Sequence, residues 1–277
     1  MRWLVLIALV VACGGAKPQC PIVAPAAPGP AFLWKAHKDG GAVVWLYGTI
    51  HDAGLDAVPP AALAAFDTAP RLITELGDVT PDPYVFRDHA RIASGKGIDQ
   101  QLPADDWWDL RDALLGKVKE ADLRRAKPWY AMSLLTSASS PTPGPSMDSE
   151  LAKRATARKV PVEAFETWQD QLAMLDAAVR ISDLQEAIHA RKTMHCDLSR
   201  LIDAYRAGDT ATMEALLLVP RTVDTLLAPR NKKWLPAIEK QFAQGGAFIA
   251  VGLGHLLGDR GLVAMLQTAG YTVEQIR

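Results

Sequence analysis

The sequence has few cysteines, no excess of charge of one sign and no apolar run long enough to cross a bilayer as a helix. Its 277 residues include three cysteines, and 30 basic against 31 acidic side chains leave a net charge of −1. Such a balance gives no electrostatic attraction to nucleic acid, and no basic patch with interleaved aromatic residues is present. We therefore expect no nucleic-acid partner.

Several catalytic motifs are also missing. The chain contains no GxSxG, Walker A, HExxH or CxxC sequence. These absences exclude the serine-hydrolase nucleophile elbow, the nucleotide P-loop, the helical zinc-protease motif and a vicinal dithiol centre.

The N-terminal segment has the pattern of an export signal. Arg2 precedes the apolar run "WLVLIALVVA" (3–12), which is shorter than the ~20 residues of a membrane-spanning helix. The end of this run, "LVVAC", resembles the bacterial lipobox, whose cysteine becomes the lipidated first residue of the mature protein. We expect residues 1–12 to be a lipoprotein signal peptide and Cys13 to carry lipid. The alternative is a plain secretory signal that is cleaved nearby.

Residues 13–31 are rich in Pro, Gly and Ala, which is typical of a flexible tether. Gly14 follows the lipobox cysteine, and the absence of Asp there resembles outer-membrane sorting in a cell with two membranes. We therefore expect an exported protein that is lipid-anchored at the outer membrane and faces the periplasm. In that oxidising compartment Cys20 and Cys196 are expected to form a disulfide, with two free thiols as the alternative.

The next part of the chain has the pattern β-β-α-β. Two apolar runs at 32–38 and 42–50, separated by "DGG", predict a hairpin. A helix entered through proline is expected at 59–69, and an apolar strand at 71–77.

The C-terminal end has a similar order, with a strand at 247–253, a helix at 261–269 and a strand at 271–276. We predict an α/β domain over 32–277, with a mixed central sheet built from two β-α-β halves and a large helical segment at about 80–245 between them. The elements expected within that segment are helices at 83–95, 104–121, 127–138 and 147–159, a strand at 160–166, and a series of helices over 168–242.

Two histidines follow an apolar strand and a glycine turn with the same GxxH spacing. The stretch "GTIH" ends at His51 and "GLGH" ends at His255. Chance would give about 0.4 such spacings in this composition, so the context carries more weight than the spacing. Ligands of open α/β sheets bind beyond the carboxyl ends of the strands, where both histidines are expected to lie.

Two carboxylates share this placement, because Glu75 and Glu166 close the predicted strands at 71–77 and 160–166. Two imidazoles and one or two carboxylates are suitable ligands for Zn, Mn, Co or Fe. A carboxylate outside the metal's coordination shell could act as a general base. The alternative is structural, with the histidines as capping residues, Glu75 paired with Arg71, and Glu166 at the start of a helix.

The remaining candidates are weaker. His189 and His195 are six positions apart on a predicted helix and therefore face different sides. His37 and His89 have no evident partner, and Asp148 is interpreted as a helix N-cap.

Stretches across the whole mature chain resemble the TraB/GumN family, which includes TIKI-type Wnt-cleaving membrane proteases. The most specific elements of this resemblance are the two GxxH motifs, the glutamate after the third strand, and an Arg-Asn pair before the last helix. One departure is Leu257, where the family commonly has proline. The stretches that carry the resemblance are residues 32–51, 71–78, 146–172, 205–209, 228–234 and 248–276.

The resemblance implies that His51, Glu75 and His255 form a centre for a divalent metal such as Mn, Co or Zn. It also implies that Arg230 and Asn231 line the same pocket. With Glu75, these two residues and the strand-end Glu166 make up the expected catalytic set, and Asp148 matches a position that is often acidic.

The family is similar to haem-binding ChaN-like proteins and to erythromycin-esterase-like hydrolases. From the cluster of histidines and glutamates we expect a metal-dependent hydrolase of the peptidase type, with a peptide or a small molecule as its substrate. A second hypothesis is a non-catalytic lipoprotein that holds haem, a metal or a peptide in the same cleft. A third is a scaffold whose histidines only satisfy buried polar groups.

Overall fold

The computed structural model describes residues 20, 29–38, 40–51, 53–78, 81–141 and 144–276. The predicted signal peptide, the lipidation site at Cys13 and most of the tether lie outside these residues. Among the described residues, no helix combines the length and the apolar content that crossing a bilayer requires.

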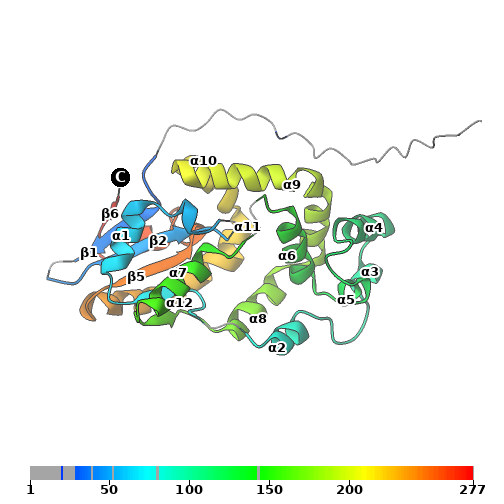
Figure 1. Ribbon diagram of the computed structural model, residues 1–277, viewed down its shortest axis with the longest axis horizontal. Coiled ribbons are helices and arrows are strands. Elements are labelled where there is room, and N and C mark those ends of the chain that lie inside the picture. Colours follow the sequence, from blue (N-terminus) through cyan, green and yellow to red (C-terminus); the bar gives the residue numbers. More distant parts are fainter. Residues whose placement is uncertain are drawn as a thin grey trace, which may run out of the picture.

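A six-stranded mixed sheet forms the centre of the fold, in the order β4-β3-β5-β2-β1-β6 (Figure 1). The strands β2, β5, β3 and β4 run parallel, whereas β1 pairs antiparallel with both β2 and β6. The predicted α/β fold with a mixed sheet and a helical insertion is confirmed. The strands are β1 (Leu33–His37), β2 (Val44–Thr49), β3 (Leu72–Thr74), β4 (Val162–Ala164), β5 (Ala247–Gly252) and β6 (Thr272–Gln275).

The two predicted halves interleave in the sheet, because β5 from the C-terminal half lies between β2 and β3. Its first five residues, Ala247 to Val251, are fully buried, as expected for a parallel strand covered on both faces. Since parallel strands end at the same edge, this insertion brings the end of β5 beside the ends of β2 and β3.

Helices cover the sheet and form a separate helical body beside it (Figure 1). The predicted helix at 104–121 is wrong in extent, because a turn with Gly116 at φ 76° separates α4 from α5. The helices are α1 (Pro60–Thr68), α2 (Pro83–His89), α3 (Ile98–Gln101), α4 (Ala104–Ala113), α5 (Glu120–Arg124), α6 (Pro128–Ser139), α7 (Met147–Ala157), α8 (Trp168–Ala178), α9 (Ile181–Ala207), α10 (Thr210–Leu217), α11 (Pro220–Thr222), α12 (Ala228–Ala243) and α13 (Leu262–Thr268).

The long helix α9 belongs to two hydrophobic cores. Its Leu184 and Ile188 are buried in the core of the helical body, which α3 to α6 complete. Near its other end, Ile202 and Tyr205 are buried in the core of the sheet. The helix ends at Gly208, whose φ of 68° is the left-handed conformation usual for a glycine after a helix.

Tyr205 fastens α9 to the carboxyl end of β2. Its hydroxyl donates a hydrogen bond of 2.7 Å to the carbonyl of Gly48 and lies 2.7 Å from the hydroxyl of Tyr47. Burial raises the pKa of both tyrosines, so both stay protonated and able to donate. The turn that leads to His51 is therefore fixed by a helix distant in the sequence.

Gly48 allows the end of β2 to approach Leu253, which precedes His255. A Cβ at position 48 would lie 2.4 Å from Cδ1 and 3.1 Å from Cα of Leu253.

We expect Gly48→Ala to lower the free energy of unfolding by about 1–3 kcal/mol, because backbone as well as side chain must move. Urea denaturation measures the loss. Gly144→Ala is the control, since its Cβ would meet nothing within 4 Å. Equal stability of the two variants would contradict the close approach.

Candidate functional site

Four of the predicted site residues come together where the parallel strands end, namely Glu75, Glu166, His255 and Arg230. Glu75 directly follows β3, Glu166 follows β4 by two residues, and His255 closes the short 3₁₀ turn after β5. Arg230 lies in the first turn of α12, after a π-helical turn at Val223–Leu227. Turns of this kind are uncommon and are frequent at functional sites.

The guanidinium of Arg230 binds the other three of these side chains. Its Nε donates to Glu166 at 3.1 Å, and its Nη2 donates to both Glu75 and Glu166. Its Nη1 lies 3.0 Å from Nε2 of His255. The side chains of Arg230, Glu75 and Glu166 are only 12, 12 and 4 % exposed, so this is a buried charge cluster.

Asn231 fixes the proton on His255. The amide nitrogen of Asn231 donates to the carbonyls of His255 and Arg260, which leaves its oxygen to accept from Nδ1 of His255 at 2.7 Å. The hydrogen bonds therefore assign the His255 proton to Nδ1 and leave a lone pair on Nε2. This tautomer is the one that accepts from Arg230, and it is also the one that can bind a metal through Nε2.

Burial lowers the pKa of His255 to about 4, although the Glu75 carboxylate 3.8 Å from Nε2 acts in the opposite direction. The imidazole is therefore neutral at neutral pH. Burial disfavours the charged form of Glu75, but the neighbouring His255, Arg230 and His51 and the N–H of Gly252 outweigh it and lower the pKa of Glu75 to about 2. The pair is a neutral base beside an ionised carboxylate.

The pKa of Glu166 is shifted in the opposite direction, upward. Burial raises its pKa, Arg230 opposes this effect, and the negative charge of Glu75 adds to it. Two carboxylates that share one guanidinium thus differ in proton affinity. A difference in pKa between two neighbouring carboxylates is characteristic of sites that carry out acid–base catalysis.

His51 lies at the surface of this arrangement, with 76 % of its side chain exposed. Its Nδ1 is 3.5 Å from Oδ2 of Asp148, whose Oδ1 accepts a hydrogen bond of 2.8 Å from Thr49. Within the described part of the chain, Oδ2 of Asp148 is buried and accepts no hydrogen bond. The prediction that Asp148 caps α7 is wrong, because Ser146 caps it by accepting from the N–H of Ser149.

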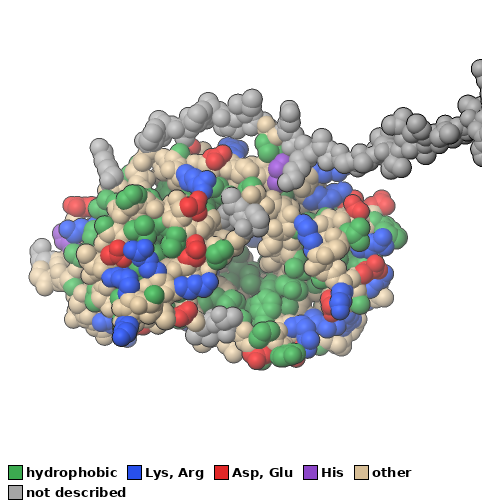
Figure 2. Space-filling view, viewed as in Figure 1, with side chains coloured by type: hydrophobic (Ala, Val, Ile, Leu, Met, Phe, Trp, Pro, Cys, Tyr) green, Lys and Arg blue, Asp and Glu red, His purple; other side chains and the backbone are tan. Residues whose placement is uncertain are grey.

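Two adjoining cavities reach these residues. One of about 440 Å³ is lined by His51, Glu75 and Asp148, and one of about 410 Å³ is lined by Glu166. Figure 2 shows the molecule hollowed between its two bodies, with hydrophobic side chains inside the hollow. Both cavities have Leu76, Pro81 and Trp168 in their walls.

The predicted metal ligands are brought near one another, but they do not form a closed set. Among the described residues, Cys20, His195 and Cys196 are the one group of three whose ligand atoms all lie within 4.8 Å of one another. His51, Glu75 and His255 do not meet this criterion. Glu75 links the two histidines, because it lies 3.8 Å from His255 and lines the same cavity as His51.

A profile of the TraB/PrgY/gumN family matches residues 32–275. The chain belongs to this family. No curated protein and no solved structure matches it.

The donor chemistry of this TraB/PrgY/gumN chain fits the divalent metal that the resemblance implies. His255 offers a neutral nitrogen, Glu75 an ionised carboxylate and His51 an exposed imidazole. Oδ2 of Asp148 is buried beside His51 and accepts no hydrogen bond from a described residue, so this oxygen is a further ligand atom for a metal. Because Arg230 already binds Nε2 of His255 and Oε2 of Glu75, a metal must compete with this guanidinium for them.

Some features of the site have no clear signal in the sequence. The packing of Trp234 against His255, with ring centroids 4.5 Å apart and the rings tilted by 38°, depends on how α12 crosses the end of β5. The serine in "PSMDSE", three positions before the N–H that it caps, is the signal that could have identified Ser146 as the cap in place of Asp148.

Removing the positive charge from the buried cluster should destabilise the fold. We expect Arg230→Gln to cost about 3–5 kcal/mol, because it leaves two carboxylates without a counter-charge. Adding Glu166→Gln should recover part of the loss, as measured by urea denaturation. Arg260→Gln is the control, since its pair with Asp224 is exposed and should cost less than about 1 kcal/mol. No recovery in the double variant would show that charge imbalance is not the cause.

The lowered pKa of His255 predicts a loss of stability in weak acid. A buried neutral imidazole contributes stability that is fully present above pH 6.5 and is lost as the pH falls toward about 4. The free energy of unfolding, measured from pH 7 to 4.5, should fall less steeply for His255→Gln than for the wild type. The exposed His89 gives the control variant His89→Gln, which should follow the wild type. Equal slopes for all three proteins would contradict the shift.

Proposed function

We propose that this protein is a metal-dependent hydrolase that acts on peptides and is exported as a lipid-anchored protein. Membership of the TraB/PrgY/gumN family supports the proposal. The observation that carries it is the fixed tautomer of His255, which leaves the unprotonated Nε2 3.8 Å from the ionised Glu75, beside the cavity that Glu75 and His51 line. A neutral imidazole nitrogen and a carboxylate side by side are ligand types that a divalent cation takes.

In this proposal, His51, Glu75 and His255 hold a divalent cation such as Mn, Co or Zn. A cation of this kind would supply an activated water and polarise a carbonyl group. Glu166, whose pKa is raised, is suited to give or take a proton at the cavity that it lines. Arg230 carries a fixed positive charge that can stabilise negative charge developing on a bound carbonyl oxygen, and Asn231 holds His255 in place.

The substrate would enter through the cavity lined by His51 and Glu75. Its volume of about 440 Å³ lies in the range of sites for small ligands or a few side chains. The proposal also includes export, with lipid on Cys13, a Pro/Gly/Ala-rich tether and a location at the outer membrane facing the periplasm. That part rests on the sequence pattern alone.

A second candidate is a binding lipoprotein without catalysis that holds a peptide, a metal or haem in the same cleft. One observation favours it, because Arg230 already forms ion pairs with both Glu75 and Glu166 and donates to Nε2 of His255. These contacts hold the cluster together without a metal.

Metal content distinguishes the candidates. We expect the protein, purified without chelator, to hold about one divalent metal per chain, and His51→Ala and His255→Ala to hold none. Elemental analysis measures the occupancy. A quenched fluorescent peptide library, with its products sequenced, measures hydrolysis. Circular dichroism checks that the variants fold, and His37→Ala serves as the control, since His37 lines neither of the two cavities.

Metal in the wild type, lost in both variants together with peptide cleavage, would support the hydrolase. Metal binding without cleavage of any library peptide would favour the binding lipoprotein. No metal in the wild type, even after incubation with Mn, Co and Zn, would contradict the proposal.

A further inference from the structure

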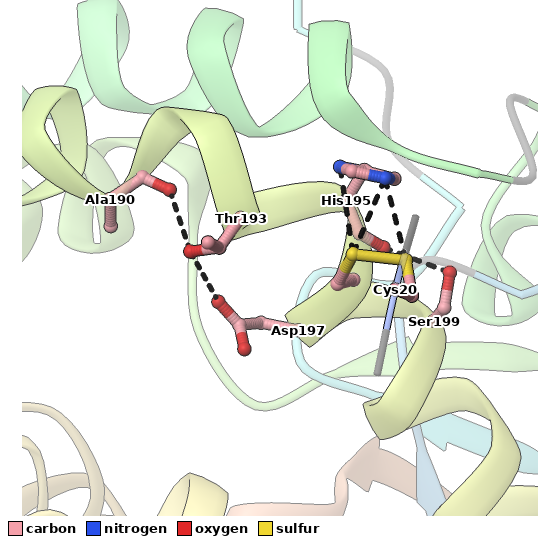
Figure 3. Close-up of a disulfide and its surroundings, with 7 residues drawn as sticks. Cys20, Ala190, Thr193, His195, Asp197 and Ser199 are labelled. Atoms are coloured by element: carbon pink, nitrogen blue, oxygen red, sulfur yellow. Dashed lines mark hydrogen bonds between the residues drawn. A yellow bond between two sulfur atoms is a disulfide. The ribbon is translucent and has the colours of Figure 1, made fainter. Parts of the chain in front are cut away.

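A second group of potential ligands lies on α9, outside the strand-end site. Cys20 and Cys196 form a disulfide with their Cα atoms 5.2 Å apart. The Nε2 atom of His195 lies 3.4 Å from Sγ of Cys20 and 3.3 Å from Sγ of Cys196. Figure 3 shows the imidazole ring placed against both sulfur atoms. Two sulfurs and a ring nitrogen are thus gathered at one point.

We propose that Cys20, Cys196 and His195 form a redox-gated site for a borderline-soft divalent cation, of which Zn²⁺ is the natural example. In the disulfide form the site cannot bind the cation, because two sulfurs that are bonded to each other are not thiolates. Reduction opens the site and yields a Cys₂His ligand set. Solvent supplies the fourth position, since among the described residues this group has three ligands only.

The distances suit this conversion. In a tetrahedral zinc site, bonds of about 2.3 Å to sulfur and about 2.0 Å to nitrogen place sulfur and nitrogen about 3.5 Å apart and the two sulfurs about 3.8 Å apart. The observed nitrogen–sulfur distances of 3.3 and 3.4 Å are already close to the first value. Only the two sulfurs, which are bonded to each other in the disulfide, must move apart.

The chain keeps Cys20 close after reduction. The N–H of Gly29 donates to the carbonyl of Ala207 at 2.6 Å, so the chain is fixed to α9 again nine positions after Cys20. A short loop of this kind keeps the effective concentration of the freed thiol high. Cys20 is exposed, while His195 and Cys196 are half-buried, so a reductant can reach the disulfide from the Cys20 side.

The chemistry balances with a dithiol as reductant. The dithiol supplies two electrons and two protons, the sulfur–sulfur bond breaks, and the reductant leaves as its own disulfide. Binding of the cation then replaces the proton on each cysteine, so two protons are released per metal bound. The metal would fasten Cys20 to α9 in place of the covalent bond.

Cobalt tests this site directly. The full chain carrying Cys13→Ser, which retains Cys20 and Cys196 as its two cysteines, is reduced with a phosphine, which leaves as its oxide with oxygen from water. After anaerobic removal of the phosphine, Co²⁺ is added. We expect one equivalent to give a thiolate-to-cobalt charge-transfer band in the near ultraviolet and the intense visible bands of tetrahedral cobalt. Zn²⁺ should displace it.

The controls separate this site from the strand-end site, which has no sulfur ligand and cannot give the charge-transfer band. Unreduced protein and Cys196→Ser should lack the two-thiolate spectrum. His195→Ala should bind Co²⁺ at least about tenfold more weakly, whereas His189→Ala, on the same helix, should bind as the parent does. The proposal is overturned if the reduced parent shows no such band, or if His195→Ala binds as tightly as the parent.

Discussion

Arg230 carries a positive charge into the interior at the edge where the parallel strands end, and the rest of the site is arranged around that charge. A buried guanidinium is tolerated only with counter-charges and saturated hydrogen bonds, and Glu75, Glu166 and His255 provide them. The same cation keeps Glu75 ionised, while burial raises the proton affinity of Glu166. The two carboxylates share this cation but differ in proton affinity because their other surroundings differ: His255, His51 and the N–H of Gly252 act on Glu75, and burial dominates at Glu166.

The sheet makes this arrangement possible. Because β5 lies between β2 and β3, three segments distant in the sequence end side by side. Helix α12 then brings Arg230 and Asn231 to the end of β5, where one binds Nε2 of His255 and the other binds Nδ1. Adjacent residues on one helix therefore act on the two nitrogens of one ring.

Much of this could be predicted from the sequence, because strand ends are marked by apolar runs and glycines. That pattern placed His255, Glu75 and Glu166 at one edge of an α/β sheet. The pattern does not report which side chains touch. The ion pairs of Arg230 join positions 155 and 64 residues apart and depend on how α12 packs. The orientation of His51 toward Asp148 depends likewise on α7, whose position no local pattern specifies.

The attachment of Cys20 to α9 also limits where the domain can stand. Cys13 and Cys20 are seven positions apart, and an extended chain of that length reaches about 25 Å. With lipid on Cys13, the disulfide would therefore hold the Cys196 region of α9 within that distance of the bilayer and orient the domain relative to the membrane. Without it, the next described contact that ties the chain to α9 is at Gly29, sixteen positions from Cys13, and the reach to that contact would be about 55 Å. A single sulfur–sulfur bond would thus determine whether the protein lies against the membrane or extends into the space beyond it.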